Sequence, residues 1–385
     1  MRRTVYNEDH EAFRETLRAF IEAEVVPVHE EWYAAGQVPR DFYHTLGDLG
    51  IFGIEVPEQY GGAGQESFKF QAVLSEECAR AGVSFGGSSV HVALCLPYLK
   101  AYATEEQKKR WLPDFVSGRC MFAIAMTEPG TGSDLAGMRT TARLSEDGTH
   151  YVLNGAKTFI TGGVHADRVI VCARTAAATA EDRRFGISLL VVDTRSEGYA
   201  VGRKLDKLGL RTSDTAELSF TDVRVPVEDL LGEENKGFSY LGQNLPRERL
   251  GIAVGAYAQA AAAVRFAQDY VQERTVFGKP VAAFQNTKFE LAACKAEVDA
   301  AEAVVDRALE AHDLGELTAA EAASAKLFTT EVAHRVIDRC LQLHGGYGYM
   351  NEYPIARLYA DNRVNRIYGG TSEVMKMIIA KSMGL

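Results

Sequence analysis

The first segment whose composition suits ligand binding is residues 126–137 (MTEPGTGSDLAG), which is rich in small polar residues and glycines. Glycine has no side chain, so its backbone can approach a flat or phosphorylated ligand closely. Taken alone, the segment fits an ordinary tight loop better, because glycine-rich loops are common. It is therefore a candidate ligand loop that needs support from other parts of the sequence.

The sequence lacks the usual signatures of several enzyme classes. It contains no HExxH, and its nine histidines form no metal-like cluster, so we predict no metal site. The glycines at residues 130–137 have the wrong spacing for a Rossmann fingerprint, and neither a P-loop nor a GxSxG motif occurs. Nicotinamide binding by the usual fold, P-loop nucleotide binding and serine hydrolysis are therefore disfavoured.

The elements that must position the candidate loop fall into three zones, of which the first is helical. Phe13, Leu17 and Val25 recur at helical spacing, and Pro27 closes that first helix. We predict an N-terminal α-helical domain over residues 1–118.

Short β-branched runs characterise the middle zone, residues 119–232. Two of them, residues 168–174 and 186–193, read as strands. Asp-Gly at 147–148 and Asn-Gly at 154–155 predict hairpin turns, because Asn and Asp before Gly tolerate positive φ angles. This zone predicts an antiparallel β-domain of barrel or sandwich type.

Helical patterns return in the last zone, residues 233–385. No proline occurs from residue 281 to residue 353, and Gly315 falls in a predicted turn between two helices. We predict a C-terminal four-helix bundle here. The chain as a whole is then mainly α with a central β-domain.

Composition narrows the class of protein further. The net charge of −10 opposes binding to nucleic acid and to anionic membrane surfaces. The most apolar long stretch, residues 251–267, contains Gln259 and Arg265, so we expect no membrane insertion, and no secretory signal is visible. Six cysteines lie far apart without a CxxC, which is typical of a reducing compartment. We expect a soluble cytoplasmic protein.

Five separated motifs resemble the acyl-CoA dehydrogenase family. They are residues 126–137, 157–163 (KTFITGG), 274–279 (RTVFGK), 342–346 (QLHGG) and 367–372 (IYGGTS). They occur in order and cover nearly the whole chain, and the family's three domains agree with the three zones. The resemblance implies FAD-dependent α,β-dehydrogenation of an acyl-CoA to the trans-2-enoyl-CoA in fatty-acid or branched-acyl catabolism. It also implies electron transfer to an electron-transfer flavoprotein and a homotetramer built as a dimer of dimers.

The resemblance further implies that FAD lies between the β-domain and the bundle, with a neighbouring subunit completing the site. Its ring and phosphates would contact residues of the middle domain, namely Ile124, Met126, Thr127, Gly132, Ser133, Phe159, Ile160 and Thr161. Its adenine half would contact C-terminal residues, namely Arg274, Phe277, Phe284, Gln285, Gln342, Leu343, Gly345, Gly346, Thr371, Ser372 and Glu373. Phe159 stands where the family often has Trp, and a benzene ring can still cover a flavin face.

The catalytic base departs from the family's commonest pattern. Removing an α-proton needs a carboxylate, and most relatives place a Glu where this sequence has Gly369. Long-chain and isovaleryl members carry it on an earlier helix, in a segment resembling residues 245–250 (LPRERL), which assigns the role to Glu248. Without the family, Glu248 between two arginines would read as a solvated carboxylate. The sequence beyond it is apolar from Leu250 onwards, which indicates that this end of the helix enters the interior.

Substrate contacts also follow from the resemblance. Ser133, Gly369 and Gly370 match positions that line the thioester slot, and Arg249 either contacts the CoA portion or holds Glu248. The backbone N–H of Gly369, with a ribityl hydroxyl of FAD, would polarise the thioester carbonyl.

Three other functions stay open at this point. The same chemistry can act on an acyl group tethered to a carrier protein in biosynthesis. The missing carboxylate at Gly369 leaves room for a non-catalytic flavin-binding subunit of a mixed tetramer, and the fold also hosts oxidases and nitroalkane-oxidising enzymes. The sequence does not indicate the length of the acyl chain, because Tyr98 or Phe85 either shortens the acyl pocket or lies outside it.

Overall fold

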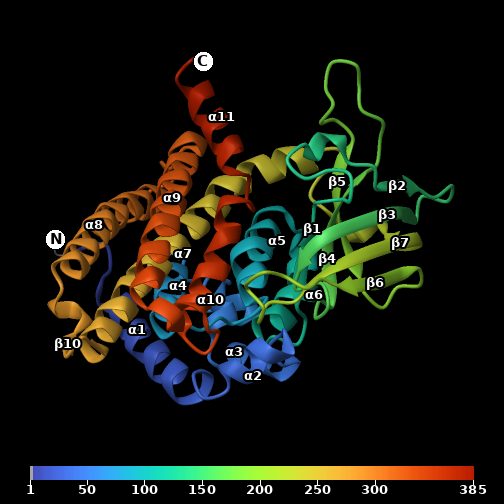
Figure 1. The fold of residues 1–385 in the computed structure, drawn as a ribbon. Coiled ribbons are helices and arrows are strands. Elements are labelled where there is room, and N and C mark those ends of the chain that lie inside the picture. Colours follow the sequence, from blue (N-terminus) through green and yellow to red (C-terminus); the bar gives the residue numbers. More distant parts are fainter. Residues whose placement is uncertain (1–2) are drawn as a thin grey trace.

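The first part of the chain is helical because its apolar residues recur at helical spacing and face the interior. The computed structural model of the protein describes residues 3–385 (Figure 1). Leu17 and Val25 are buried, and the first helical run ends at Val25, before Pro27, as predicted. The helices of this part are α1 (Glu8–Phe20), α2 (His29–Ala35), α3 (Arg40–Asp48), α4 (Lys69–Ala81), α5 (Leu96–Tyr102) and α6 (Glu105–Val116), with π-helical segments at Ile21–Val25 and Val90–Cys95.

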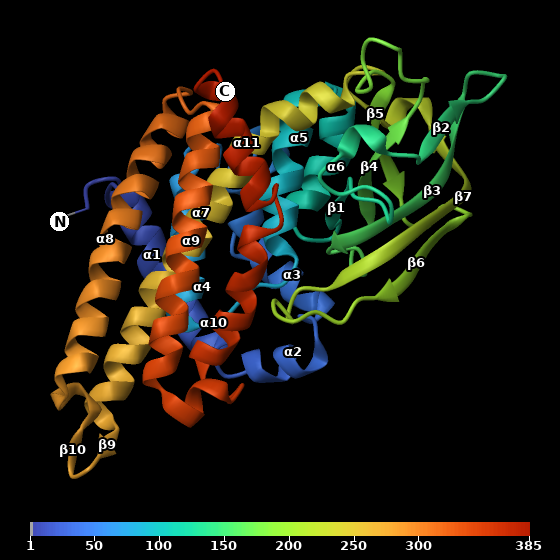
Figure 2. The same ribbon diagram turned by 45° about the horizontal axis from the view of Figure 1, so that its top comes forward.

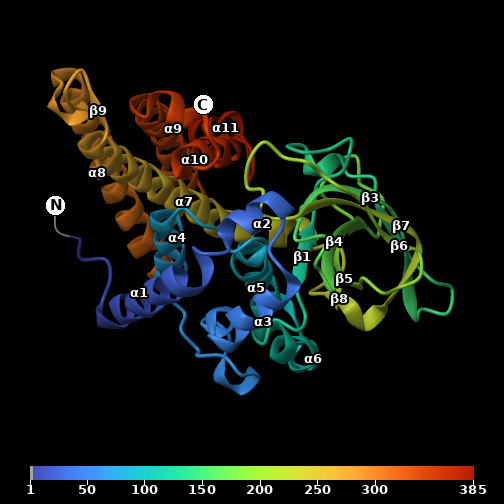
Figure 3. The same ribbon diagram turned by 60° about the horizontal axis from the view of Figure 1, so that its bottom comes forward.

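The middle part forms one strongly curved eight-stranded sheet (Figure 3). Its strands are β1 (Phe122–Ala125), β2 (Thr141–Leu144), β3 (His150–Thr161), β4 (Arg168–Arg174), β5 (Ile187–Asp193), β6 (Tyr199–Lys204), β7 (Thr215–Pro226) and β8 (Leu230–Leu231). The order is β6-β7-β3-β2-β4-β5-β8, with β1 beside β4. Most pairs are antiparallel, but β1 and β2 each pair with β4 in parallel, which the sequence patterns did not predict.

One of the two predicted hairpin turns is wrong. The Asp-Gly turn joins β2 to β3 as expected, with Gly148 at φ 67°. Asn154 and Gly155 instead lie inside β3, where the pairing with β7 shifts register. A Cβ at Gly155 would lie 2.8 Å from Cα of Thr140, so this glycine permits a close approach of two backbones rather than a turn.

Long helices make up the last part of the chain. They are α7 (Gly237–Glu273), α8 (Gln285–Asp313), α9 (Ala319–Leu343), α10 (Pro354–Asn362) and α11 (Ser372–Ser382), with a short hairpin of β9 (Thr275–Val276) and β10 (Lys279–Pro280). Helices α7, α8 and α9 pack on one another, and α10 and α11 pack against α9 (Figure 2). Gly315 lies between α8 and α9 at φ 71°, where the sequence predicted a turn.

Helix α7 runs through the interior of this bundle. By length and composition it could cross a membrane, contrary to our reading that no stretch of the sequence is that apolar. Of its most apolar window, 61% is buried inside the protein, as in the core helix of a globular protein. Its small residues, such as Ala256 and Ala263, let neighbouring helices approach closely.

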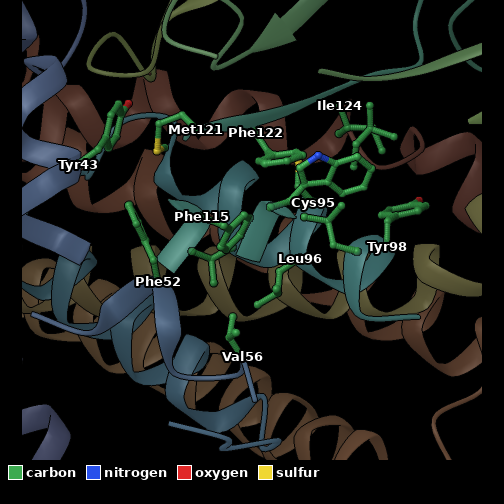
Figure 4. Close-up of a cluster of buried hydrophobic side chains, with 14 of the residues drawn as sticks. Tyr43, Phe52, Val56, Cys95, Leu96, Tyr98, Phe115, Met121, Phe122 and Ile124 are labelled. Carbon is green, nitrogen blue, oxygen red and sulfur yellow. The ribbon is translucent and has the colours of Figure 1, made fainter. Parts of the chain in front are cut away.

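A second hydrophobic core joins the N-terminal helices to the face of the sheet that carries Phe122, Ile124 and Ile170 (Figure 4). Ile124 of β1 and Tyr98 of α5 both belong to it. Because β1 leads directly into residues 126–137, this core fixes the start of the candidate ligand loop. Phe85 is buried in the same core against Phe20 and Phe42, on the N-terminal helices.

Candidate active site

One cavity of about 620 Å³ gathers residues from the ligand loop, from α7 and from the glycine turn before α11. Gly132 and all four predicted substrate contacts line it, namely Ser133, Arg249, Gly369 and Gly370. Leu245 and Phe238 of α7 add apolar wall, and the loop between β4 and β5 adds Glu181, Asp182, Arg183 and Arg184. The cavity is therefore lined by glycines and apolar side chains together with a charged loop.

Glu248 comes directly before the cavity-lining Arg249 on α7 and is only 9% exposed. It is not itself one of the residues that line the cavity. The hydroxyl of the buried Tyr98 donates a hydrogen bond to its Oε1 at 3.3 Å. Burial raises the pKa of Glu248 to about 7, although the Tyr98 hydrogen bond and the charge of Arg249 oppose this shift. Near neutral pH the carboxyl group is thus poised to gain or lose a proton, as a general base requires.

The side chains of Arg247 and Arg249, which flank Glu248 in the sequence, form their hydrogen bonds with other residues than Glu248. Arg247 forms an ion pair with the buried Glu55 at 2.6 Å, and Arg249 donates from Nε to the carbonyl oxygen of Gly369 at 3.4 Å. Within residues 3–385, neither guanidinium is hydrogen-bonded to Glu248. Arg249 acts on Glu248 only through its charge. Of the two roles considered for Arg249, contact with CoA and a direct hold on Glu248, the second is therefore not supported.

The glycine turn at residues 368–370 is held from behind by a lysine that sequence reasoning missed. Lys326 of α9 is 1% exposed, and its Nζ donates to the carbonyl oxygen of Tyr368 at 2.6 Å and to that of Gly370. Burial, together with the nearby charge of Arg249, lowers the pKa of Lys326 to about 8. One feature of the sequence could have indicated this role. Lys326 is the single lysine on the otherwise uncharged buried stripe of α9, which includes Ala322, Ala325, Thr329, Thr330 and Ala333.

A buried ion pair anchors the candidate ligand loop. Lys157 of β3 pairs with Glu128 at 2.9 Å and donates to the carbonyl oxygen of Met126 at 3.0 Å. Glu128 also accepts hydrogen bonds from the backbone N–H groups of Arg139 and Thr140. Both ends of the loop are therefore tied to one carboxylate, which sequence reasoning also missed.

The predicted ring-binding residues separate into two kinds. Ile124 and Ile160 are buried in hydrophobic cores, whereas Met126, Thr127 and Thr161 are half-buried and Gly132 and Ser133 are exposed. Phe159 is 67% exposed at φ 59°, a strained conformation for an aromatic residue. The backbone N–H of Thr158 donates to the carbonyl oxygen of Thr127 at 3.0 Å, which places the Phe159 strand beside the loop.

The predicted adenine-binding residues form a second group at the other end of α7, whose 37 residues span about 55 Å (Figure 2). Arg274 follows the last residue of α7, and its guanidinium faces the ring of Tyr347 at 5.7 Å. Phe277, in the β9–β10 hairpin, is 95% exposed and lies 6.5 Å from Phe284. Gln285 begins α8, and Gln342, Leu343, Gly345 and Gly346 lie at the end of α9. Within one chain, this group lies far from the cavity.

The remaining predicted residues begin α11. Thr371 caps this helix by accepting a hydrogen bond from the N–H of Val374, and Ser372 donates to the carboxylate of Glu331 at 3.0 Å. Glu373 is exposed in the first turn. These contacts give Thr371 and Ser372 a structural part in addition to any ligand contact.

The ligand loop and β3 fit a flat, phosphorylated group. A Cβ built on Gly130 or Gly132 meets no atom within 4 Å, so the backbone there is open to a ligand. Thr131 carries a buried hydroxyl that has no partner within residues 3–385. Together with the exposed ring of Phe159, these features supply hydrogen-bonding groups and a stacking surface at one place.

Comparison with known proteins identifies the family. Residues 7–119, 123–223 and 235–384 match the N-terminal, middle and C-terminal domains of acyl-CoA dehydrogenase. The chain belongs to the acyl-CoA dehydrogenase family. The resemblance and the three-part fold predicted from the sequence are therefore confirmed.

Individual relatives and solved structures match nearly the whole of this chain. The long-chain specific acyl-CoA dehydrogenase of Sus scrofa mitochondria is 45% identical over 381 residues, covering 99% of this chain and 88% of that protein. The solved structure of an acyl-CoA dehydrogenase from Geobacillus kaustophilus matches with a TM-score of 0.95 and 45% identity over 99% of both chains. An acyl-CoA dehydrogenase from Bacillus anthracis, solved in complex with FAD, matches with a TM-score of 0.89 and 33% identity over 98% of this chain and 67% of that chain.

Proposed function

We propose that Glu248 is the base with which this FAD-dependent acyl-CoA dehydrogenase converts an acyl-CoA to the trans-2-enoyl-CoA. The observation that carries the proposal is the buried carboxyl group of Glu248, with a pKa of about 7, beside a cavity that Arg249 and the glycine turn line. The usual position of the base holds Gly369, which has no acidic side chain. The same features weigh against a non-catalytic subunit.

FAD, when bound, supplies the oxidant that takes the hydride from the β-carbon of the acyl group. The loop at residues 126–133 and the Phe159 strand would hold its ring and phosphates, supported by the open glycines and by the unpartnered hydroxyl of Thr131. The strained, exposed Phe159 supports a stacking role for its ring.

The chain's own residues account for the proton and for the thioester. Glu248 removes the α-proton, and Tyr98 holds its carboxylate in place through one hydrogen bond. The N–H of Gly369 donates to the thioester oxygen and stabilises the negative charge that forms there as the proton leaves. Burial of Glu248 excludes water and keeps the carboxylate basic.

We assign the charged end of the cavity to the CoA portion of the substrate. Arg183 and Arg184 lie there on the β4–β5 loop, and guanidinium groups bind phosphates as planar donor forks. Arg183 is already paired with Asp134 at 2.9 Å, and the guanidinium of Arg184 lies 5.2 Å from the ring of Phe238. An acyl group on a carrier protein carries a single phosphate on its arm, so it would use less of this surface.

The proposed assembly, electron acceptor and domain boundaries are each supported by a separate observation. Arg274 lies 25 residues along the chain from the cavity-lining Arg249, about 38 Å of helix, which favours its use by a neighbouring subunit's cofactor in a dimer of dimers. The family resemblance supports an electron-transfer flavoprotein as acceptor. Domain boundaries after residues 118 and 232 are supported by the change from helices to strands and back.

Anaerobic flavin bleaching tests the proposal. The purified protein is mixed with straight-chain acyl-CoAs from butyryl to stearoyl, with branched acyl-CoAs, and with one acyl-carrier-protein thioester. Bleaching by an acyl-CoA is expected, and the length series ranks the substrates. Bleaching by the carrier-protein thioester alone would move the protein to the biosynthetic alternative, and no bleaching by any thioester would refute the proposal.

A further inference from the structure

Two buried cations bind three successive carbonyl groups of the glycine turn. Lys326 binds the carbonyl oxygens of Tyr368 and Gly370, and Arg249 binds that of Gly369 between them. The cations come from different helices, α9 and α7. All three carbonyl groups of residues 368–370 are therefore engaged by these two side chains.

The N–H groups of the same peptide units remain free. In a trans peptide the C=O and N–H bonds point in opposite directions, and none of the described residues forms a cis peptide bond. The N–H of Gly369 thus points away from Lys326, and that of Gly370 points away from Arg249. Across residues 3–385, no acceptor pairs with either N–H. Gly369 lines the cavity, so the turn offers its unpaired N–H to whatever binds there, whereas the N–H of Gly370 points away from Arg249, which lines the same cavity.

The turn needs an external restraint to keep this orientation. Gly369 and Gly370 both have positive φ angles, 62° and 96°, and glycine has wide conformational freedom. With no side chains of their own, the two glycines cannot fix their peptide planes by packing. Hydrogen bonds from two cations are strong enough to do so, because charged donors bind more tightly than neutral ones.

Burying the charged side chain of Lys326 costs more free energy than a purely structural role would require. Among residues 3–385 its ammonium group bonds to the backbone carbonyl groups of Tyr368 and Gly370 and to no carboxylate, so only these carbonyl groups offset its lost hydration. Its neighbours on the buried stripe, such as Ala325 and Thr329, are small and satisfied by packing or by their own helix. An apolar side chain at position 326 would fill the same space without this cost.

We propose that Lys326 is a positioning residue that fixes the peptide planes of residues 368–370, so that the N–H of Gly369 meets the thioester oxygen. This inference rests on the proposed function, since it assigns the turn to the thioester. Lys326 touches neither the substrate nor the base. It acts through the turn, while Arg249 holds the central carbonyl from the cavity side.

The variants are Lys326→Met, which removes the ammonium group but keeps an unbranched chain, and Lys326→Gln, whose amide can still donate to one carbonyl. Lys295→Met on the exposed face of α8 is the matched control. The readout is the infrared carbonyl band of a bound 2-azaacyl-CoA labelled with carbon-13 at the thioester carbonyl, an analogue with nitrogen in place of the α-carbon, so that Glu248 has no α-carbon proton to remove and the analogue cannot be dehydrogenated. This band reports polarisation of the carbonyl independently of turnover.

Wild type and Lys295→Met should shift the carbonyl band to lower frequency on binding. Lys326→Met should lose most of that shift, and Lys326→Gln should keep part of it, while both retain FAD. The rate of flavin reduction by a saturating acyl-CoA should fall about 10- to 100-fold in Lys326→Met, less than complete loss of an oxyanion donor costs.

Glu248→Gln separates the two claims, because it should keep the full carbonyl shift while losing flavin reduction. A wild-type protein that shows neither a shift nor flavin reduction would refute the proposed function itself. A full shift in both Lys326 variants, beside a normal wild type, would overturn the role of Lys326 alone. Failure of both variants to fold or retain FAD would also overturn it, by making the lysine structural.

Discussion

At the residue scale, the chemistry depends on how Glu248 is surrounded. Tyr98 from α5 donates to it, Arg249 from α7 adds positive charge, and the thiols of Cys95 and Cys172 lie nearby. Burial raises the pKa of both thiols, so they stay neutral near pH 7. The ionisation of Glu248 is therefore controlled by burial, by one hydrogen bond and by one cation.

The first prediction concerns the pH dependence of the rate. The base form of Glu248 is the carboxylate, so kcat/KM should rise with pH through about 7 and then level off. Tyr98→Phe removes a hydrogen bond that stabilises the carboxylate, which should raise the pKa and move the rising limb to higher pH. Measured pH profiles of wild type and Tyr98→Phe check this. An unchanged limb in Tyr98→Phe would show that the hydroxyl does not contact the active carboxylate.

The second prediction concerns the vacant base position. A side chain at Gly369 would collide with Cδ1 of Ile252 and would force a φ of 62° on a residue with a Cβ. We therefore expect Gly369→Glu to rescue Glu248→Gln poorly, and better when Ile252→Ala is added. Anaerobic flavin reduction by one acyl-CoA, compared between the double and triple variants, measures this. Equal rescue with and without Ile252→Ala would show that the isoleucine is no obstacle.

At the element scale, the third prediction concerns the anchor of the ligand loop. Lys157 and Glu128 form a buried pair, and removing one partner leaves an unpaired buried charge. Lys157→Met should destabilise the protein by about 3–5 kcal/mol and weaken FAD retention, and adding Glu128→Gln should restore part of the stability. Thermal unfolding and FAD titration of the three proteins test this. A double variant no more stable than Lys157→Met would show that the charge is not the cause.

Periodicity and turn residues were enough to predict the three zones, because helices and strands follow local patterns of apolar residues. They failed at Asn154 and Gly155, where the dipeptide typical of a turn serves a close backbone contact with Thr140. Only those site residues that lie within the family motifs could be predicted from the sequence. Contacts such as that between Lys326 and the glycine turn join segments 42 residues apart or more, and no local pattern encodes them.

At the scale of the whole molecule, the separation of the Arg274 group from the cavity gives the fourth prediction. Arg274→Ala should weaken FAD retention, and so lower activity, through a neighbouring subunit's site. When Arg274→Ala and Glu248→Gln are co-expressed, a mixed dimer contains one site with an intact Glu248 and an intact Arg274 from the neighbour. Activity should then return to about a quarter of the wild-type value for random pairing.

The control is a mixture of the two variants purified separately and kept from exchanging subunits, which should show no more than the residual activity of Arg274→Ala. If the co-expressed protein is no more active than that mixture, Arg274 serves its own chain or no cofactor at all. Recovery would tie the exposed hairpin of β9 and β10 to a second subunit's chemistry.

The central claim is that Glu248 removes the α-proton, and stopped-flow flavin reduction under anaerobic conditions tests it most directly. Glu248→Gln should bind FAD and acyl-CoA as wild type does but reduce flavin about 10²- to 10⁴-fold more slowly, because only the proton transfer is lost. Glu316→Gln, an exposed site beyond α8, is the control and should match wild type. Flavin reduction at a near wild-type rate in Glu248→Gln would contradict the account.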